Sequence, residues 1–172
     1  MIVSNWRKAL LPIVLSVVLL FSSACANKAP SRYAQTQKET SGRNAPAAVA
    51  KNAEAGGAFN KFFPQGDGGY ARVFSQEKKG FAEAKLNKGG KNVAVLSISD
   101  TSSLPAAAKK YDKSTTNLNS YPLLEEAPLK STGVLVNKRF QVKVASRDPA
   151  FTAIDRKAWL QKFNLDGLSK LK

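Results

Sequence analysis

The sequence predicts an α+β domain in which an antiparallel sheet of about five or six strands carries helices on one face. Two pairs of β-prone segments are each joined by turn residues, which is the pattern of a β-hairpin. Two other segments begin with helix-capping residues, one between the hairpins and one after the second. Strands that are joined by short turns pair antiparallel, which sets the sheet type.

The first hairpin is predicted from residues 81–86 and 93–99, which flank Gly89 and Gly90. Primed hairpin turns need positive φ angles, and glycine adopts these at no steric cost. Both alternating sets of side chains in residues 93–99 are apolar, so we expect a central strand that is buried on both faces. A further strand is expected at residues 70–75.

The second hairpin is predicted from residues 133–136 and 139–144, which flank Asn137-Lys138. Apolar and polar residues alternate along residues 139–144, which is typical of a half-buried strand. Residues 121–124 are expected to form an edge strand, because the proline at position 122 is tolerated at a sheet edge.

Two helices are expected from their capping residues. Asp100 and Pro105 suit the start of a helix over residues 105–113. Thr152 and Asp155 have the spacing of a capping box at the start of the last helix. Its predicted apolar stripe consists of Ile154, Ala158, Trp159 and Phe163.

The first 24 residues have the organisation of a secretory signal peptide. Arg7 and Lys8 precede an apolar run over residues 10–21, and small residues follow it. This run is too short for a membrane span, which needs about 20 apolar residues. The sequence Ser23-Ala24-Cys25 resembles the bacterial lipobox, which implies a diacylglycerol-modified Cys25 as a membrane anchor. The alternative is an ordinary signal peptide with an incidental cysteine.

After the signal peptide, residues 25–58 are expected to form a flexible tether that begins at the lipidated Cys25. They are rich in small and polar residues and contain almost no large apolar ones. The alternative is an arm that wraps the surface of the domain. Residues 59–172 are long enough for a single domain with its own core. Without residues 1–24 the chain keeps 25 Lys and Arg against 12 Asp and Glu, so the exported protein carries a charge of +13.

The composition argues against catalysis and against metal binding. The 172 residues include no histidine, so a Ser-His-Asp triad and the commonest metal ligand are both excluded. A single cysteine excludes an internal disulfide and a zinc ribbon. Glu125 and Glu126 are the adjacent carboxylates, but neighbouring residues of a strand point in opposite directions. We therefore expect no catalytic residues, no cofactor and no bound metal.

The positive charge favours a binding function. Lys138, Arg139, Lys143 and Arg147 lie in one short stretch and were expected, together with Lys109, Lys110 and Lys113, to form a cationic surface. Such a surface suits an acidic membrane-protein partner or anionic lipid head groups. Nucleic acid is not expected as a partner of an exported protein. The alternative is a carrier of a small apolar or amphipathic ligand between sheet and helix, lined by Phe81, Phe140, Trp159 and Phe163.

Four stretches support a family resemblance. Residues 121–122, 133–144 and 159–168 resemble the end of small bacterial lipoprotein domains of unknown function, and residues 76–83 are similar to cyanobacterial members. The general shape is similar to the PsbP/DcrB-type α+β fold, whose photosynthetic members are extrinsic subunits in the thylakoid lumen. The resemblance implies an exported accessory protein on the periplasmic or lumenal side of a membrane, and it implies no catalytic residue.

Overall fold

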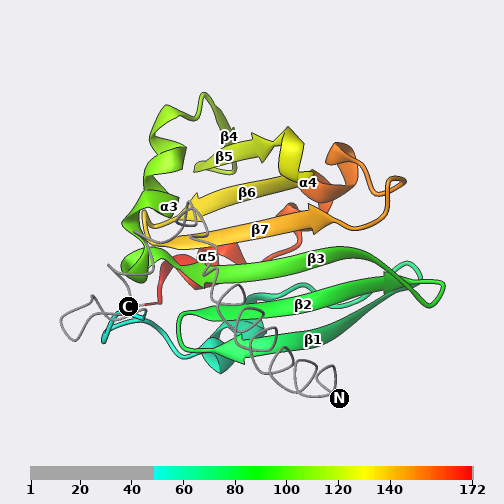
Figure 1. The fold of residues 1–172 in the computed structure, drawn as a ribbon, viewed down its shortest axis with the longest axis horizontal. Helices are drawn as coiled ribbons and strands as arrows, with labels where there is room; N and C mark the ends of the chain where they lie inside the picture. The colour runs from blue at the N-terminus through cyan, green and yellow to red at the C-terminus, as the bar shows by residue number, and fades with distance from the viewer. Residues whose placement is uncertain (1–48, 172) are drawn as a thin grey trace, which may run out of the picture. The chain divides into compact units, whose positions relative to one another are not determined.

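The computed structural model describes residues 49–171 (Figure 1). The predicted signal peptide, Cys25 and residues 26–48 of the predicted tether lie outside the described residues. A seven-stranded antiparallel sheet has the order β1-β2-β3-β7-β6-β5-β4. The strands are β1 (Tyr70–Lys78), β2 (Phe81–Lys88), β3 (Lys91–Asp100), β4 (Thr116–Leu118), β5 (Tyr121–Glu126), β6 (Ser131–Val136) and β7 (Phe140–Ser146).

The α+β class and the antiparallel sheet are confirmed, but the expected number of five or six strands is too low. The additional strand is β4, which has three residues. A segment of this length is too short to show an alternating pattern. Because β4 pairs with β5, the segment that was expected at the sheet edge is the second strand from that edge.

Both predicted hairpin turns are present. Gly89 and Gly90 have φ angles of 56° and 77°, and Asn137 and Lys138 have φ angles of 51° and 53°. Gly89 and Gly90 form a two-residue turn between the paired residues Lys88 and Lys91. In the second hairpin Val136 pairs with Phe140, so the connection has three residues, Asn137, Lys138 and Arg139, and is one residue longer than predicted. The β3–β7 pairing then joins the β1–β3 meander to the β4–β7 meander and places these two strands at the middle of the sheet.

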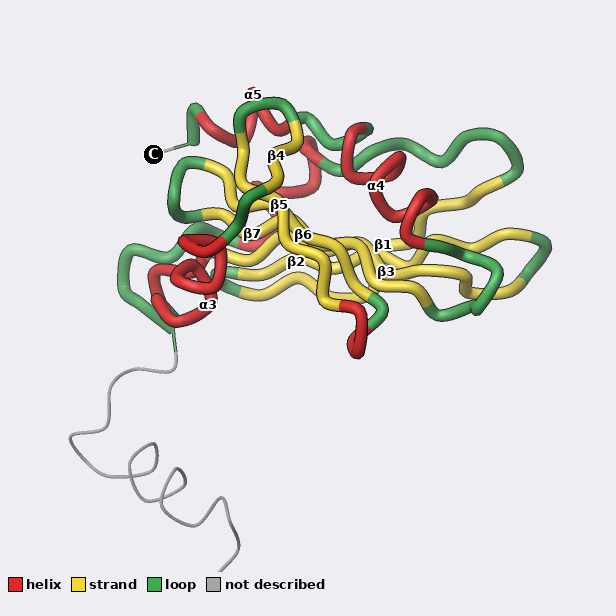
Figure 2. Tube along the Cα trace, turned by 90° about the horizontal axis from the view of Figure 1, so that it is seen from above, coloured by secondary structure: helices red, strands yellow, loops and turns green. Residues whose placement is uncertain are grey.

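Helical segments cover both faces of the sheet, so the expectation of helices on one face is wrong. Figure 2 shows α4 and α5 on one side of the sheet and α3 on the other. Tyr111, in the turn after α3, reaches Gln141 on the face opposite the main core. The helical segments are η1 (Gly56–Phe62), η2 (Thr101–Ser103), α3 (Pro105–Lys109), η3 (Lys110–Lys113), η4 (Ala127–Leu129), α4 (Ala153–Gln161) and α5 (Leu165–Ser169).

The main core lies between the sheet and the segments η1, α4 and α5. The rings of Phe59 and Phe140 meet edge to face with 5.9 Å between their centroids, and Trp159 is also buried. The capping box of Thr152 and Asp155 is confirmed. The predicted apolar stripe of α4 is wrong at Ile154, which is 79% exposed, and at Ala158, which is also exposed.

Residues 49–58, which were expected to belong to the tether, pack against the domain. Ala53 is buried, and the Gly80 N–H donates to the Glu54 carbonyl at 2.6 Å. The Glu54 N–H donates to the Asp100 carboxylate at 3.0 Å. The packed part of the chain therefore begins before residue 59. Within residues 49–171, no helix is both long enough and apolar enough to cross a membrane.

Candidate functional site

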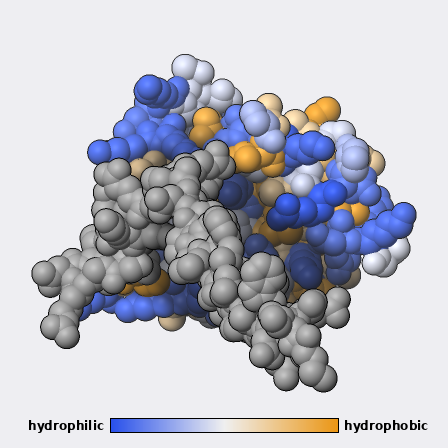
Figure 3. All heavy atoms as spheres, in the orientation of Figure 1, coloured by the Kyte–Doolittle hydropathy of each residue, from blue (hydrophilic) through white to orange (hydrophobic). Residues whose placement is uncertain are grey.

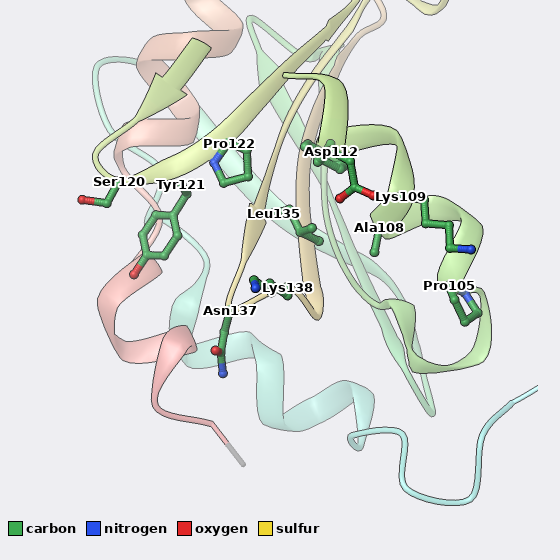
Figure 4. Close-up of a pocket in the computed structure, with 11 residues that line it drawn as sticks. Pro105, Ala108, Lys109, Asp112, Ser120, Tyr121, Pro122, Leu135, Asn137 and Lys138 are labelled. Carbon is green, nitrogen blue, oxygen red and sulfur yellow. The ribbon is translucent and has the colours of Figure 1, made fainter. Parts of the chain in front are cut away.

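A groove with a volume of about 710 Å³ lies between the α3–η3 segment and the β5–β6 part of the sheet (Figure 4). We call it the α3/β5 groove. Tyr111 and Leu135 lie on the face of the sheet opposite the main core, whereas Tyr121 packs against that core and its hydroxyl donates to the Asp166 carboxylate at 3.3 Å. The residues that line the groove are Pro105, Ala108, Lys109, Tyr111, Asp112, Ser120, Tyr121, Pro122, Leu135, Asn137 and Lys138.

The floor and walls of the groove are largely apolar. Leu135 belongs to β6, where Val134 and Val136 point to the main core, so its side chain points to the opposite face and into the groove. Figure 4 shows Tyr121 and Pro122 on one side of Leu135 and Ala108 on the other. This arrangement presents an apolar slot at the surface of the domain.

Tyr111 holds η3 against the sheet at the back of the groove. Its hydroxyl accepts a hydrogen bond from Nε2 of Gln141 at 3.0 Å, and the residue is 4% exposed. Burial raises the pKa of Tyr111 to about 12, although the Gln141 hydrogen bond lowers it and the charge of Glu126 adds to the rise. The phenol therefore stays neutral near pH 7 and acts as a structural contact.

The position of Tyr111 depends on a glycine below it. A Cβ atom added at Gly133 would lie 2.4 Å from the Tyr111 hydroxyl oxygen but 3.6 Å from the ring carbon Cζ. We expect Gly133→Ala to lower the free energy of unfolding by about 1–3 kcal/mol, because the ring must move out of its packed site. Denaturation in urea measures this change.

The control for Gly133→Ala is the double variant with Tyr111→Phe, which removes the clashing oxygen. Tyr111→Phe alone should lower the free energy of unfolding by about 1 kcal/mol, because it removes the hydrogen bond with Gln141. The added Cβ then keeps one tight contact, 3.2 Å to the Val142 carbonyl oxygen, so Gly133→Ala should cost less in the Tyr111→Phe background than in the parent chain. If the losses of stability of the two single variants simply add in the double variant, the clash with the Tyr111 hydroxyl is not the cause of the instability of Gly133→Ala.

Lysines stand on the rim of the groove. Lys109 of α3 and Lys138 of the β6–β7 turn are both exposed, and neither pairs with a carboxylate within residues 49–171. Lys110 is engaged with Glu126 at 3.2 Å. Among the residues that line the groove, Asp112 is the one acid. The rim therefore carries a small excess of positive charge over an apolar floor.

The predicted basic patch on β7 is not a single surface, and this expectation is corrected. Lys138 and Arg147 lie beyond opposite ends of β7, and Lys143 lies between them on the open face of the sheet. The eight residue steps from Arg139 to Arg147 span about 25 Å in an extended strand. Of the four predicted residues, the structure brings only Lys138 to the groove.

Arg139 has a structural role. Its guanidinium pairs with the buried Asp100 carboxylate at 2.7 Å and donates to the Asn52 carbonyl at 3.0 Å. Burial raises the pKa of Asp100, but hydrogen bonds from Arg139, from Ser102 and from the Glu54 N–H outweigh it and lower the pKa to about 2. The charge of Arg139 is therefore compensated within the domain.

A second polar cluster lies inside the main core. Arg156 of α4 is 7% exposed and donates to the hydroxyls of Thr132 and Ser146, each at 2.8 Å. It also pairs with Glu125, which accepts a further hydrogen bond from Thr132. Glu126 points the opposite way and pairs with Lys110, as strand alternation predicted. Because these polar groups satisfy one another, the cluster is structural.

Three of the four aromatic residues expected to line a ligand pocket, Phe140, Trp159 and Phe163, belong to the main core. Phe140, Trp159 and Phe163 are buried, Phe81 is half-buried, and none of the four lines the α3/β5 groove. No sequence pattern predicted a site at the groove residues Tyr121 and Leu135. In the strand, Leu135 alternates with Val134 and Val136. If these valines face the core, Leu135 must point to the opposite face of the sheet, and this alternation could have indicated the groove.

Within residues 49–171, no group of three or more potential ligands is placed to hold a metal ion. Comparison of the chain with protein-family models, with curated proteins and with solved structures finds no match in any of the three.

Proposed function

We propose that this chain is a lipid-anchored, non-enzymatic accessory or binding protein on the periplasmic or lumenal side of a membrane. Its α3/β5 groove receives an acidic segment of a membrane-protein partner. The observation that carries this proposal is the open apolar slot with Lys109 and Lys138 on its rim. An apolar side chain of the partner fills the slot, and its carboxylates meet the lysines.

The charge of the domain supports an acidic partner. Residues 49–171 contain 20 Lys and Arg against 11 Asp and Glu, a net charge of +9. Hydrophilic side chains cover most of the described surface that is visible in Figure 3, with smaller hydrophobic areas among them. Complementary charge speeds the encounter of two proteins and selects against basic partners. Once the partner is bound, the apolar floor of the groove adds buried hydrophobic contacts to the electrostatic attraction.

The position of Cys25 in the sequence supports a lipid anchor. The one cysteine of the chain, Cys25, follows a short apolar run and small residues, at the position that lipidation requires. Several acyl chains on one residue give stable anchoring, whereas a single chain holds only marginally. Anchoring would keep the domain in the plane of the membrane where the proposed partner resides.

Site-specific photo-crosslinking in cells tests this function. A photoreactive residue replaces Ser120, an exposed residue at the groove, and in a control it replaces Leu129, which is 63% exposed on η4. We expect position 120 to capture one membrane protein through a segment rich in Asp and Glu, and position 129 not to capture it. Equal capture from both positions, or capture through a segment without acidic residues, would contradict the proposal.

The groove volume favours a second candidate, a carrier of a small amphipathic ligand. A volume of about 710 Å³ lies within the range of small-molecule sites. Native mass spectrometry of the chain, isolated in mild detergent, would then show a bound small molecule at one copy per chain. Leu135→Trp fills the slot and should remove that molecule. A chain that carries no small molecule would exclude the carrier function.

A further inference from the structure

The start of α3 exposes an uninterrupted apolar segment. Leu104, Pro105 and Ala106 are consecutive and exposed, and Leu104 is 62% accessible to solvent. We call these three residues the α3 tip. Leu104 is the residue before the helix, and most of its apolar side chain is open to solvent.

The chain enters the domain beside the α3 tip. The Ala50 N–H donates to Oγ of Ser103 at 2.7 Å, so the first described residues lie next to Leu104. Val49, the first described residue, is itself an apolar residue with 37% exposure. Cys25 lies 24 residues before Val49, a length of chain that spans at most about 85 Å. An anchor at Cys25 therefore joins the domain at the end that carries the α3 tip.

Several lysines lie at the end of the domain that carries the α3 tip. Lys79 donates to the Lys51 carbonyl at 2.7 Å, and Lys109 and Lys138 line the groove together with Pro105 of the α3 tip. We call Lys51, Lys79, Lys109 and Lys138 the end lysines. The acids of this region are fewer: Asp100 is buried and paired with Arg139, which leaves Glu54, Glu77 and Asp112. Apolar residues flanked by lysines are the composition of segments that lie on a membrane surface.

We propose that the α3 tip and the end lysines rest on the surface of an anionic phospholipid bilayer. Leu104 enters the boundary between head groups and acyl chains, and the end lysines meet lipid phosphates and other anionic head groups. Attraction of this kind acts within a Debye length, so salt weakens it. This inference rests on the proposed membrane anchoring but not on a protein partner in the groove.

The test uses the full chain reconstituted into vesicles whose acyl chains carry bromine, which quenches nearby tryptophan. Leu104→Trp is compared with Leu129→Trp, because the two leucines are 62% and 63% exposed. Leu129 lies at the opposite end of the domain, since the neighbouring Lys130 carbonyl accepts from the Ser146 N–H at the far end of β7. The parent chain, which begins at the lipidated Cys25, gives the background of the buried Trp159.

We expect the added emission of Leu104→Trp to be quenched in phosphatidylglycerol vesicles, and to recover in 1 M salt or in phosphatidylcholine vesicles. The added emission of Leu129→Trp should remain unquenched in all cases. Equal quenching of both variants, no quenching of either, or equal quenching of Leu104→Trp in both lipids would overturn the inference. A chain that stays with the vesicles while Leu104→Trp remains unquenched overturns only this inference, whereas a chain that does not associate with vesicles overturns the anchoring as well.

A second variant separates this surface from the groove. Lys51→Glu combined with Lys79→Glu reverses two end lysines that do not line the α3/β5 groove. In the Leu104→Trp background this change should reduce quenching in phosphatidylglycerol vesicles. Unchanged quenching would overturn the role of the end lysines. Since the vesicles contain no protein partner, failure of the proposed partner binding does not affect the result.

Discussion

Replacing Glu125 by leucine should lower the free energy of unfolding by about 3–5 kcal/mol, the largest effect expected from a single side chain here. Arg156 is 7% exposed, and its charge is balanced by Glu125. The hydroxyls of Thr132 and Ser146 satisfy its N–H groups but carry no charge. Without Glu125, a buried cation remains with no counter-ion. Urea denaturation of the full chain measures the loss.

The matched variant is Arg156→Leu, which should cost less than Glu125→Leu. The Glu125 side chain is 30% exposed and can turn toward water when its partner is removed. The double variant should be more stable than the sum of the two single losses predicts, because no buried charge is left. If Arg156→Leu costs more than Glu125→Leu, the uncompensated cation is not the source of the instability.

Replacing Gly56 by alanine should destabilise the domain by about 3 kcal/mol, because overpacking against backbone atoms forces the chain to move. An added Cβ would lie 2.5 Å from the carbonyl oxygens of both Lys78 and Phe81. These atoms belong to β1 and β2, which are fixed by their pairing, so η1 must shift away from the sheet. The change also tests whether residues 49–58 contribute to the stability of the domain.

The neighbouring glycine is the control. A Cβ added at Gly57 would meet only the Glu77 carboxylate, at 3.4 Å, which is close to ordinary contact. Gly57→Ala should therefore change the free energy of unfolding by less than about 0.5 kcal/mol. If Gly56→Ala is equally mild, the contact between η1 and the β1–β2 hairpin contributes little to the folded state.

The two hairpins were predictable because their signals are local. Gly89 and Gly90 permit left-handed angles, and the Asn137-Lys138 turn is flanked by alternating strands. The strand β4 was not predictable, since three residues carry no period and pair only because β5 lies beside them. The start of the domain was missed for a related reason: Ala53 and Gly56 are buried but small, so no apolar run marks them.

The candidate site depends on contacts that are distant in sequence. Lys138 was identified, but Arg139 was assigned to the same surface because its partner Asp100 lies 39 residues away. Likewise α4 buries Arg156 and exposes Ile154, because Glu125 on β5 supplies the counter-charge. The groove itself forms only when Tyr111 places η3 over β6, which no local pattern of residues 105–113 specifies.

The measurement that tests the central claim most directly is crosslinking from Ser120 in two variants that lose the same amount of positive charge. One carries Lys109→Glu and Lys138→Glu on the groove rim, and the other carries Lys91→Glu and Lys157→Glu, which are exposed and lie outside the groove. We expect capture of the acidic partner to be lost in the first variant and retained in the second. Equal loss in both variants, or full capture by the first, would contradict a partner site at the α3/β5 groove.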